Sequence, residues 1–193
     1  GNFADAKVAI NAAEGLINPS DDKTKAKFYF LKGQALYANG NSSNNDIDAA
    51  IKSLNMVESV DGTDGKYSGD VAALKQAMLS NFLTKGQAAL ETKEYLKSSD
   101  NFERAYLMSP KDTLFLYYAA STSVSAQDYD KALKYYSKLK DLKFNGSELF
   151  FTAVNKETNE VENFDNKSMR DLSVKAGTHI KPEDKRGDSK ASE

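Results

Sequence analysis

The sequence predicts an all-α chain of antiparallel helix pairs, followed near the C-terminus by a short β-hairpin and a helix. Apolar residues recur at helical spacing, and the pattern around Ala105 returns around Leu139, an offset of 34 residues. The chain has 193 residues and only 3 Pro, so little interrupts its helices. The stretches 149–154 and 161–164 are β-prone and flank a turn-like segment.

Composition argues against several kinds of site. There is no Cys, which excludes a disulfide framework, a thiolate zinc site and a cysteine nucleophile. A single histidine, His179, cannot form a histidine metal cluster. The net charge of -2 argues against a general nucleic-acid binder, because such proteins neutralise phosphates with clustered Lys and Arg. With no recognisable catalytic motif either, we expect a non-enzymatic protein with no metal, no cofactor and no nucleic-acid partner.

The longest uncharged stretch runs from Thr113 to Gln127. A membrane-spanning helix needs about 20 mostly apolar residues, and this stretch is shorter and contains several Ser and Thr. We therefore expect a buried helix here and no transmembrane segment.

Two adjacent units, 79–112 and 113–146, carry the clearest repeat. In the first, an apolar helical face ends at Ser109-Pro110, which stops a helix. The offset of 34 residues superposes residues of similar size in the two units: Phe82 on Leu116, Gly86 on Ala120, Tyr95 on Tyr129, and Phe102 on Tyr136.

These units resemble the tetratricopeptide (TPR) repeat, which places small residues and aromatics at these positions. The match departs from the family pattern at Ser98 and Leu139, where Ala is usual, and at Phe144, where Pro is usual. The resemblance implies a right-handed superhelix of helix pairs whose concave face is lined by the first helix of each repeat.

The upstream chain fits the same pattern less closely. Residues 24–60 are expected to form a TPR with a loop insertion at 41–45, and residues 67–112 a TPR with an extended first helix. Residues 1–18 match only the second helix of a truncated TPR. We therefore expect the chain to be a fragment of a longer array, with exposed ends that allow self-association.

Residues 147–177 depart from the repeat and are expected to form the β-hairpin and the short helix. Asn159 is suited to a left-handed turn, Ser168 to an N-cap and Gly177 to a C-cap. Residues 178–193, with charges of both signs and no apolar periodicity, are expected to be a flexible linker.

The segment from 153 to 185 is similar to an insert found between repeats of uncharacterised exported TPR proteins of Gram-negative bacteria. This resemblance implies a periplasmic or otherwise exported protein.

The TPR resemblance also implies a groove that binds a protein or peptide partner. Its lining residues would stand at the family's usual groove positions: Lys27, Phe30, Gln34, Tyr37, Ser80, Leu83, Gln87, Leu90, Leu114, Tyr117, Ser121 and Val124. For the larger apolar members the alternative is packing against the neighbouring helix pair.

Two other functions stay open at this point. The first is a module that binds glycans or envelope polymers, with Tyr37 and Tyr117 stacking on sugars. The second is a helical accessory region of a larger protein whose activity lies beyond residue 193.

Overall fold

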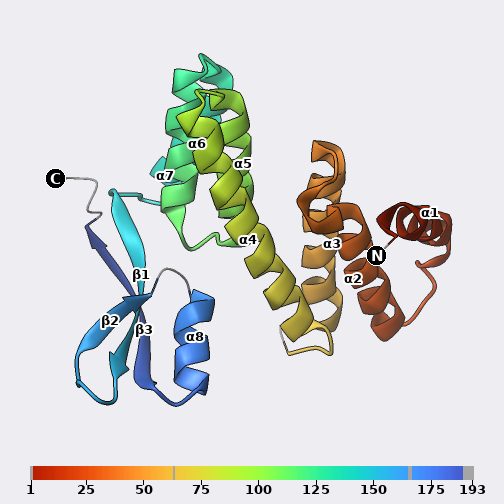
Figure 1. The fold of residues 1–193 in the computed structure, drawn as a ribbon. Helices are drawn as coiled ribbons and strands as arrows, with labels where there is room; N and C mark the ends of the chain where they lie inside the picture. The colour runs from red at the N-terminus through yellow and green to blue at the C-terminus, as the bar shows by residue number, and fades with distance from the viewer. Residues whose placement is uncertain (1, 63, 165–166, 189–193) are drawn as a thin grey trace. The chain divides into compact units, whose positions relative to one another are not determined.

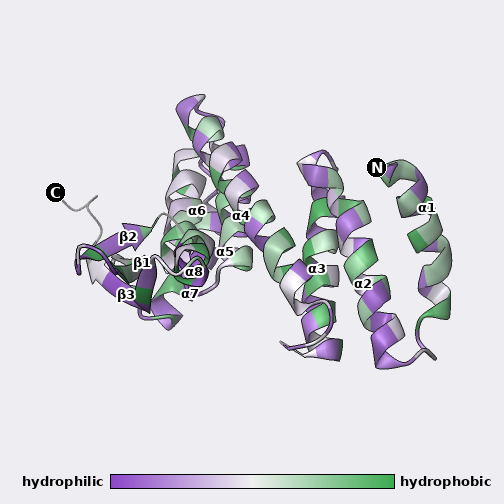
Figure 2. Ribbon diagram, turned by 60° about the horizontal axis from the view of Figure 1, so that its bottom comes forward, coloured by the Kyte–Doolittle hydropathy of each residue, from purple (hydrophilic) through white to green (hydrophobic). Residues whose placement is uncertain are grey.

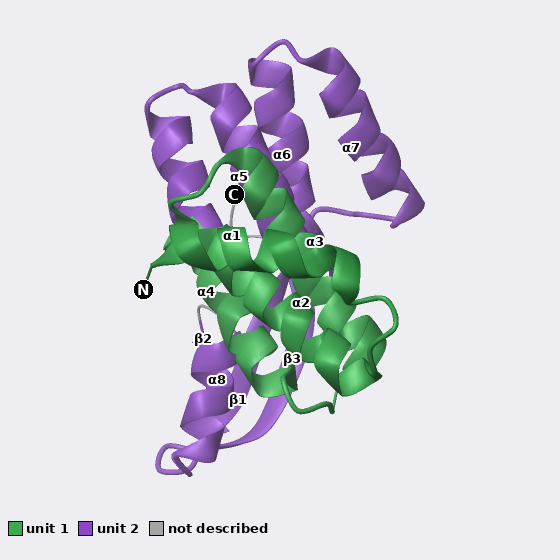
Figure 3. Cartoon of the chain, turned by 90° about the vertical axis from the view of Figure 1, so that its right-hand side faces the viewer, with its two compact units in different colours: residues 1–81 green, residues 82–193 purple. Residues whose placement is uncertain are grey.

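The computed structural model describes residues 2–62, 64–164 and 167–188, and Figure 1 shows its fold. Most of the chain is helical, and a small three-stranded antiparallel sheet lies near the C-terminus. The chain divides into two compact units, Gly1–Asn81 and Phe82–Glu193, coloured separately in Figure 3. Each unit is described by itself.

Unit 1 holds α1 (Phe3–Ala13), α2 (Asp22–Tyr37), α3 (Asn44–Asp61) and the first part of α4 (Ser68–Glu91). Short 3-10 turns, Glu14–Leu16 and Ala38–Gly40, follow α1 and α2. Apolar and polar residues are interspersed along α2 and α3 in Figure 2, and the buried residues of α2 lie on more than one side of that helix. The core residues that these two helices bury are Ala26, Phe28, Phe30, Ala35, Leu36, Tyr37, Ile47, Ala50, Ile51, Leu54 and Val57.

Helix starts in unit 1 are capped by side chains. Asp21 accepts a hydrogen bond from the Thr24 backbone N–H at 2.9 Å, which lowers the pKa of the Asp21 carboxyl. Ser43 accepts a bond from the Asp46 backbone N–H at 3.3 Å and begins α3. The loop before α3 is therefore shorter than the predicted insertion at 41–45, because Asn44 and the next residue already belong to the helix.

Unit 2 contains the second part of α4 with α5 (Tyr95–Met108), α6 (Thr113–Ser125) and α7 (Tyr129–Asp141). The uncharged stretch forms α6, and α5 ends just before Ser109-Pro110, as predicted. The buried cluster between these helices comprises Phe102, Tyr106, Leu116, Ala119, Ala120, Tyr135 and Leu139.

Ser98, which stands where the TPR pattern has Ala, is fully buried on α5. Its hydroxyl donates to the Gly86 carbonyl oxygen of α4 at 2.8 Å, so this polar side chain is satisfied at a close contact between helices.

The C-terminal part forms a sheet of order β2-β1-β3, with β1 at Ser147–Asn155, β2 at Val161–Phe164 and β3 at His179–Asp188. The predicted hairpin is confirmed, and Asn159 has a positive φ of 58° in its turn. The expectation of a flexible linker over 178–193 is wrong for residues 179–188. That segment pairs with β1 along most of its length, and residues 189–193 lie outside the described chain.

Helix α8 (Lys167–Lys175) is attached to the sheet by one buried residue, Arg170. Its guanidinium donates to the Asp184 carboxylate at 2.7 Å and to the Glu183 carbonyl oxygen at 3.1 Å. Gly177 has a φ of 81°, which confirms the predicted left-handed C-cap. Ser168 is not the N-cap, because α8 already includes Lys167 and Ser168 lies in its first turn.

Candidate peptide-binding surface

The predicted groove residues divide between the two units. Unit 1 carries Lys27, Phe30, Gln34, Tyr37 and Ser80, and unit 2 carries the other seven. The candidate surface is therefore the one that unit 2 forms by itself.

Three predicted groove residues are buried and do not line an open surface. Phe30 is 8% exposed, Tyr37 4% and Leu114 6%. Phe30 stacks on Tyr67, which precedes α4, with ring centroids 5.2 Å apart. Burial also raises the pKa of the Tyr37 phenol. For these residues the packing alternative is correct, since apolar side chains at these positions gain more from the core than from water.

The remaining unit 1 residues, Lys27, Gln34 and Ser80, are exposed.

In unit 2 the predicted residues of α4 and α6 form two apolar rows. Leu83, Gln87 and Leu90 follow one another at helical spacing on α4, as Tyr117, Ser121 and Val124 do on α6. Leu83 packs against the buried cluster to which α5, α6 and α7 contribute. We call Gln87, Leu90, Tyr117, Ser121 and Val124 the α4–α6 face.

Large apolar side chains of this face remain in contact with water. Leu90 is 42% exposed, Tyr117 38% and Val124 44%, while Gln87 is exposed and Ser121 half-buried. Helix α6 carries no charged residue. The face thus offers apolar contact area together with one amide group, from Gln87, and two hydroxyl groups, from Tyr117 and Ser121.

The Tyr117 ring contacts three other aromatic rings, among them that of Tyr118, with ring centroids 6.1 Å apart. It stacks on Phe144 with centroids 5.6 Å apart, and it meets Tyr136 edge-on at 6.5 Å. Burial and the neighbouring Tyr117 raise the pKa of Tyr136. In the repeat pattern Phe144 is only a departure from Pro, whereas in the structure its ring positions Tyr117.

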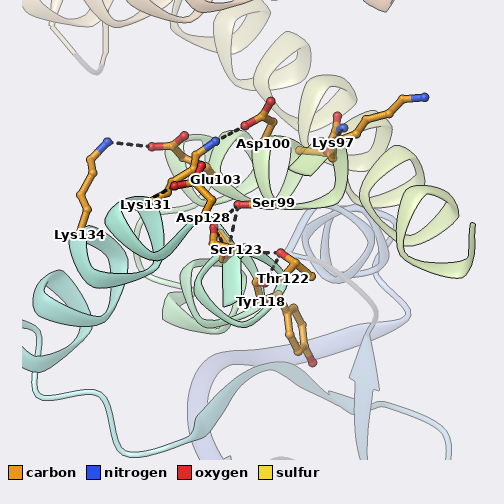
Figure 4. A network of polar contacts seen from close by, with 12 residues as sticks. Lys97, Ser99, Asp100, Glu103, Tyr118, Thr122, Ser123, Asp128, Lys131 and Lys134 are labelled. Atoms are coloured by element: carbon orange, nitrogen blue, oxygen red, sulfur yellow. Dashed lines mark hydrogen bonds and ion pairs between the residues drawn. The ribbon is translucent and has the colours of Figure 1, made fainter. Parts of the chain in front are cut away.

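Buried hydroxyls hold α6 against α5 behind the face (Figure 4). The Ser99 hydroxyl bonds to the Ser123 hydroxyl at 2.7 Å and to the Ala119 carbonyl oxygen at 3.0 Å. Thr122 donates to the Tyr118 carbonyl oxygen at 2.7 Å. The Ser99 bonds cross from α5 to α6 and fix the position of one helix against the other, whereas the Thr122 bond lies within α6.

Charged pairs join α5 to α7 in the same network (Figure 4). Lys131 pairs with Asp100, and the Lys134 ammonium lies 3.3 Å from Glu103. Asp128 caps α7 by accepting from the Lys131 backbone N–H at 3.1 Å. Helix α6 carries no charged residue, and the five residues of the α4–α6 face are all uncharged.

Neither family models, nor characterised proteins, nor solved structures give a match to this chain. The geometry of the site therefore carries the functional argument.

Within residues 2–62, 64–164 and 167–188, no group of three or more His, Asp or Glu side chains could hold a metal ion. In the same residues no helix is both long enough and apolar enough to cross a membrane.

His179 is 8% exposed and lies on β3, not at a helix end. Its Nε2 lies 3.0 Å from a Glu162 carboxylate oxygen, and its Nδ1 lies 2.9 Å from the Thr178 hydroxyl. The Phe164 ring packs edge-on against it at 5.1 Å. These contacts indicate that His179 has a structural role in the module formed by the three-stranded sheet and α8, which we call the sheet module.

Proposed function

We propose that this chain is a non-enzymatic TPR-type scaffold that binds a segment of another protein through the α4–α6 face. The observation that carries the proposal is the exposure of Leu90, Tyr117 and Val124 on helices that the buried hydroxyls and the core hold in place. Apolar side chains on a preformed surface bind with little loss of conformational entropy.

The chemistry of the face favours a particular kind of ligand. Apolar side chains of the ligand would contact Leu90, Tyr117 and Val124, and the Gln87 amide and Ser121 hydroxyl can bond to its backbone. An uncharged α6 gives no attraction to a strongly charged segment. We infer an uncharged or weakly charged peptide with two or three large apolar residues.

The same proposal places the protein in the bacterial cell envelope. Support comes from the resemblance of the segment 153–185 to the insert of exported TPR proteins. The alternative of glycan binding loses one of its two stacking rings, because Tyr37 is buried.

A peptide library displayed on phage tests the proposal. Peptides enriched on the wild type are re-measured against the double variant Leu90→Lys/Val124→Lys. Each substitution removes the burial of roughly 0.4 of an apolar side chain, about 1 kcal/mol, so affinity should fall about 10- to 30-fold. The matched control is Leu31→Lys on α2 in unit 1, since Leu31 is also 42% exposed.

The proposal fails if no peptide is enriched, or if enriched peptides bind the double variant as tightly as the wild type. Binding to a glycan array that is lost in Tyr117→Ala, without any enriched peptide, would instead support the carbohydrate alternative.

A further inference from the structure

Helix α7 exposes an apolar stripe that the α4–α6 face does not include. Tyr129 is 65% exposed, Leu133 67% and Tyr136 40%. Their spacing of four and three residues places them on one flank of the helix. We call these three residues the α7 stripe.

The stripe is separate from the two sides of α7 that already have partners. Ala132, Tyr135 and Leu139 point into the core. Lys131 and Lys134 form the ion pairs with α5. The stripe occupies a third side, and the edge contact between Tyr136 and Tyr117 shows that this side borders α6.

The corresponding positions of α5 are covered by a helix. At the offset of 34 residues, Leu133 corresponds to Ser99 and Tyr136 to Phe102. Ser99 is fully buried and Phe102 is 7% exposed. Helix α6 covers them, through the hydrogen bond from Ser99 to Ser123 and the contact of Phe102 with Tyr118 at 5.4 Å. The same flank of α7 is therefore shaped to receive a helix.

Charges at the two ends of the stripe indicate which helix fits. Asp130 lies near the start of the stripe and Lys140 beyond its end, and both are exposed. Neither has an ion-pair partner in the part of the chain that the structure describes. A ligand helix of one charge sign would match one end and be repelled by the other.

A second copy of α7 matches both ends. In an antiparallel pair centred between Leu133 and Tyr136, each Leu133 meets the partner's Tyr136. Tyr129 then lies opposite the partner's Lys140, where a cation–π contact forms. Asp130 then lies only one residue rise, about 1.5 Å along the helix axis, from the height of the partner's Lys140.

We propose that the α7 stripe pairs with the same stripe of a second copy of this chain, with the two α7 helices antiparallel about a two-fold axis. The interface is isologous, so every contact occurs twice. This interaction goes beyond the proposed peptide binding and does not depend on it.

Sedimentation equilibrium over a range of protein concentrations tests the pairing. Leu133→Lys should raise the dimer dissociation constant at least about thirtyfold, because two apolar contacts are lost per dimer. The control Leu172→Lys on α8 should leave it unchanged, although Leu172 is also 67% exposed.

A charge exchange identifies the partner as a second copy. Asp130→Lys or Lys140→Asp alone places like charges opposite each other twice and should weaken the dimer about three- to tenfold. The double variant Asp130→Lys/Lys140→Asp should dimerise more tightly than either single variant but less tightly than the wild type, because Lys140→Asp also removes the cation–π contact with Tyr129.

A wild type that stays monomeric at the highest concentration, or a dimer unaffected by Leu133→Lys, overturns the proposal. If the double variant dimerises no more tightly than the single variants, the antiparallel arrangement is overturned. Leu133→Lys should still bind the enriched peptide. Loss of the dimer in this variant is then independent of peptide binding by the α4–α6 face.

Discussion

Replacement of Gly33 by Ala tests how closely α2 and α3 approach each other in unit 1. A methyl group at this position would lie 2.7 Å from Leu54 Cδ2 and 2.9 Å from Leu54 Cγ. Leu54 is fully buried, so its side chain has no free space to move into. The Ala50 carbonyl oxygen, 3.5 Å away, closes another side.

Two opposing terms decide the size of the effect. Ala is a better helix former than Gly by about 0.8–1 kcal/mol. Overpacking of a filled core costs about 1–3 kcal/mol. Because both short contacts involve a side chain that cannot yield, we expect Gly33→Ala to lower the free energy of unfolding by about 1–2 kcal/mol.

Two other helical glycines provide controls. A methyl group at Gly69, near the start of α4, would have nothing within 4 Å, so Gly69→Ala should stabilise by about 0.5–1 kcal/mol. At Gly86 the nearest atom is Phe102 Cε1 at 3.2 Å, which predicts an intermediate effect. Urea unfolding followed by circular dichroism measures all three. A Gly33→Ala variant as stable as Gly69→Ala would refute the reasoning.

Three further predictions concern the buried polar contacts. Ser99→Ala and Ser123→Ala should each destabilise by about 1 kcal/mol, and the double variant by clearly less than the sum, since the two hydroxyls bond to each other at 2.7 Å. Arg170→Met should destabilise by about 2–3 kcal/mol and speed hydrogen exchange in α8, because it leaves carboxylates and a carbonyl oxygen without their donor. Glu162→Gln should destabilise the sheet module at neutral pH, because the hydrogen bond from His179 lowers the pKa of the Glu162 carboxyl.

The direction of the pH effect follows from that lowered pKa. The Glu162 carboxylate contributes its full stabilisation above its ordinary pKa of 4.5, and loses it as pH falls through the lower value of the folded state. Wild type and Glu162→Gln should therefore converge in stability at acidic pH, and a difference independent of pH would contradict the assignment. Strict additivity at the two serines, or unchanged exchange in α8 of Arg170→Met, would contradict the other two predictions.

The helices could be predicted from the sequence because their apolar spacing and stop signals are local. The end of α5 before Pro110 is an example, and the strand Val161–Phe164 was predictable in the same way from its β-prone residues beside a turn. Strand β3 could not, because the residues from His179 to Asp188 show no alternation of apolar and polar side chains and include Pro182. Its stability comes from pairing with β1 and from Arg170, and these are contacts with distant residues.

The exposure of the predicted groove residues was anticipated only in part, for a similar reason. The repeat positions located Leu90, Tyr117 and Val124, which are exposed. They also included Phe30, which is buried, because Tyr67 stacks on it from an irregular segment that the repeat pattern does not describe. A position within a repeat specifies the direction of a side chain but not which neighbour covers it.

Amide chemical-shift mapping tests the proposed binding surface most directly. A peptide enriched on the wild type is added to the isotopically labelled chain, and shift changes are followed by residue. We predict that the largest changes fall in 82–91 of α4 and in α6, and that Leu90→Lys/Val124→Lys abolishes them at the same peptide concentration. Changes confined to unit 1, or to the sheet and α8, would contradict the proposed function.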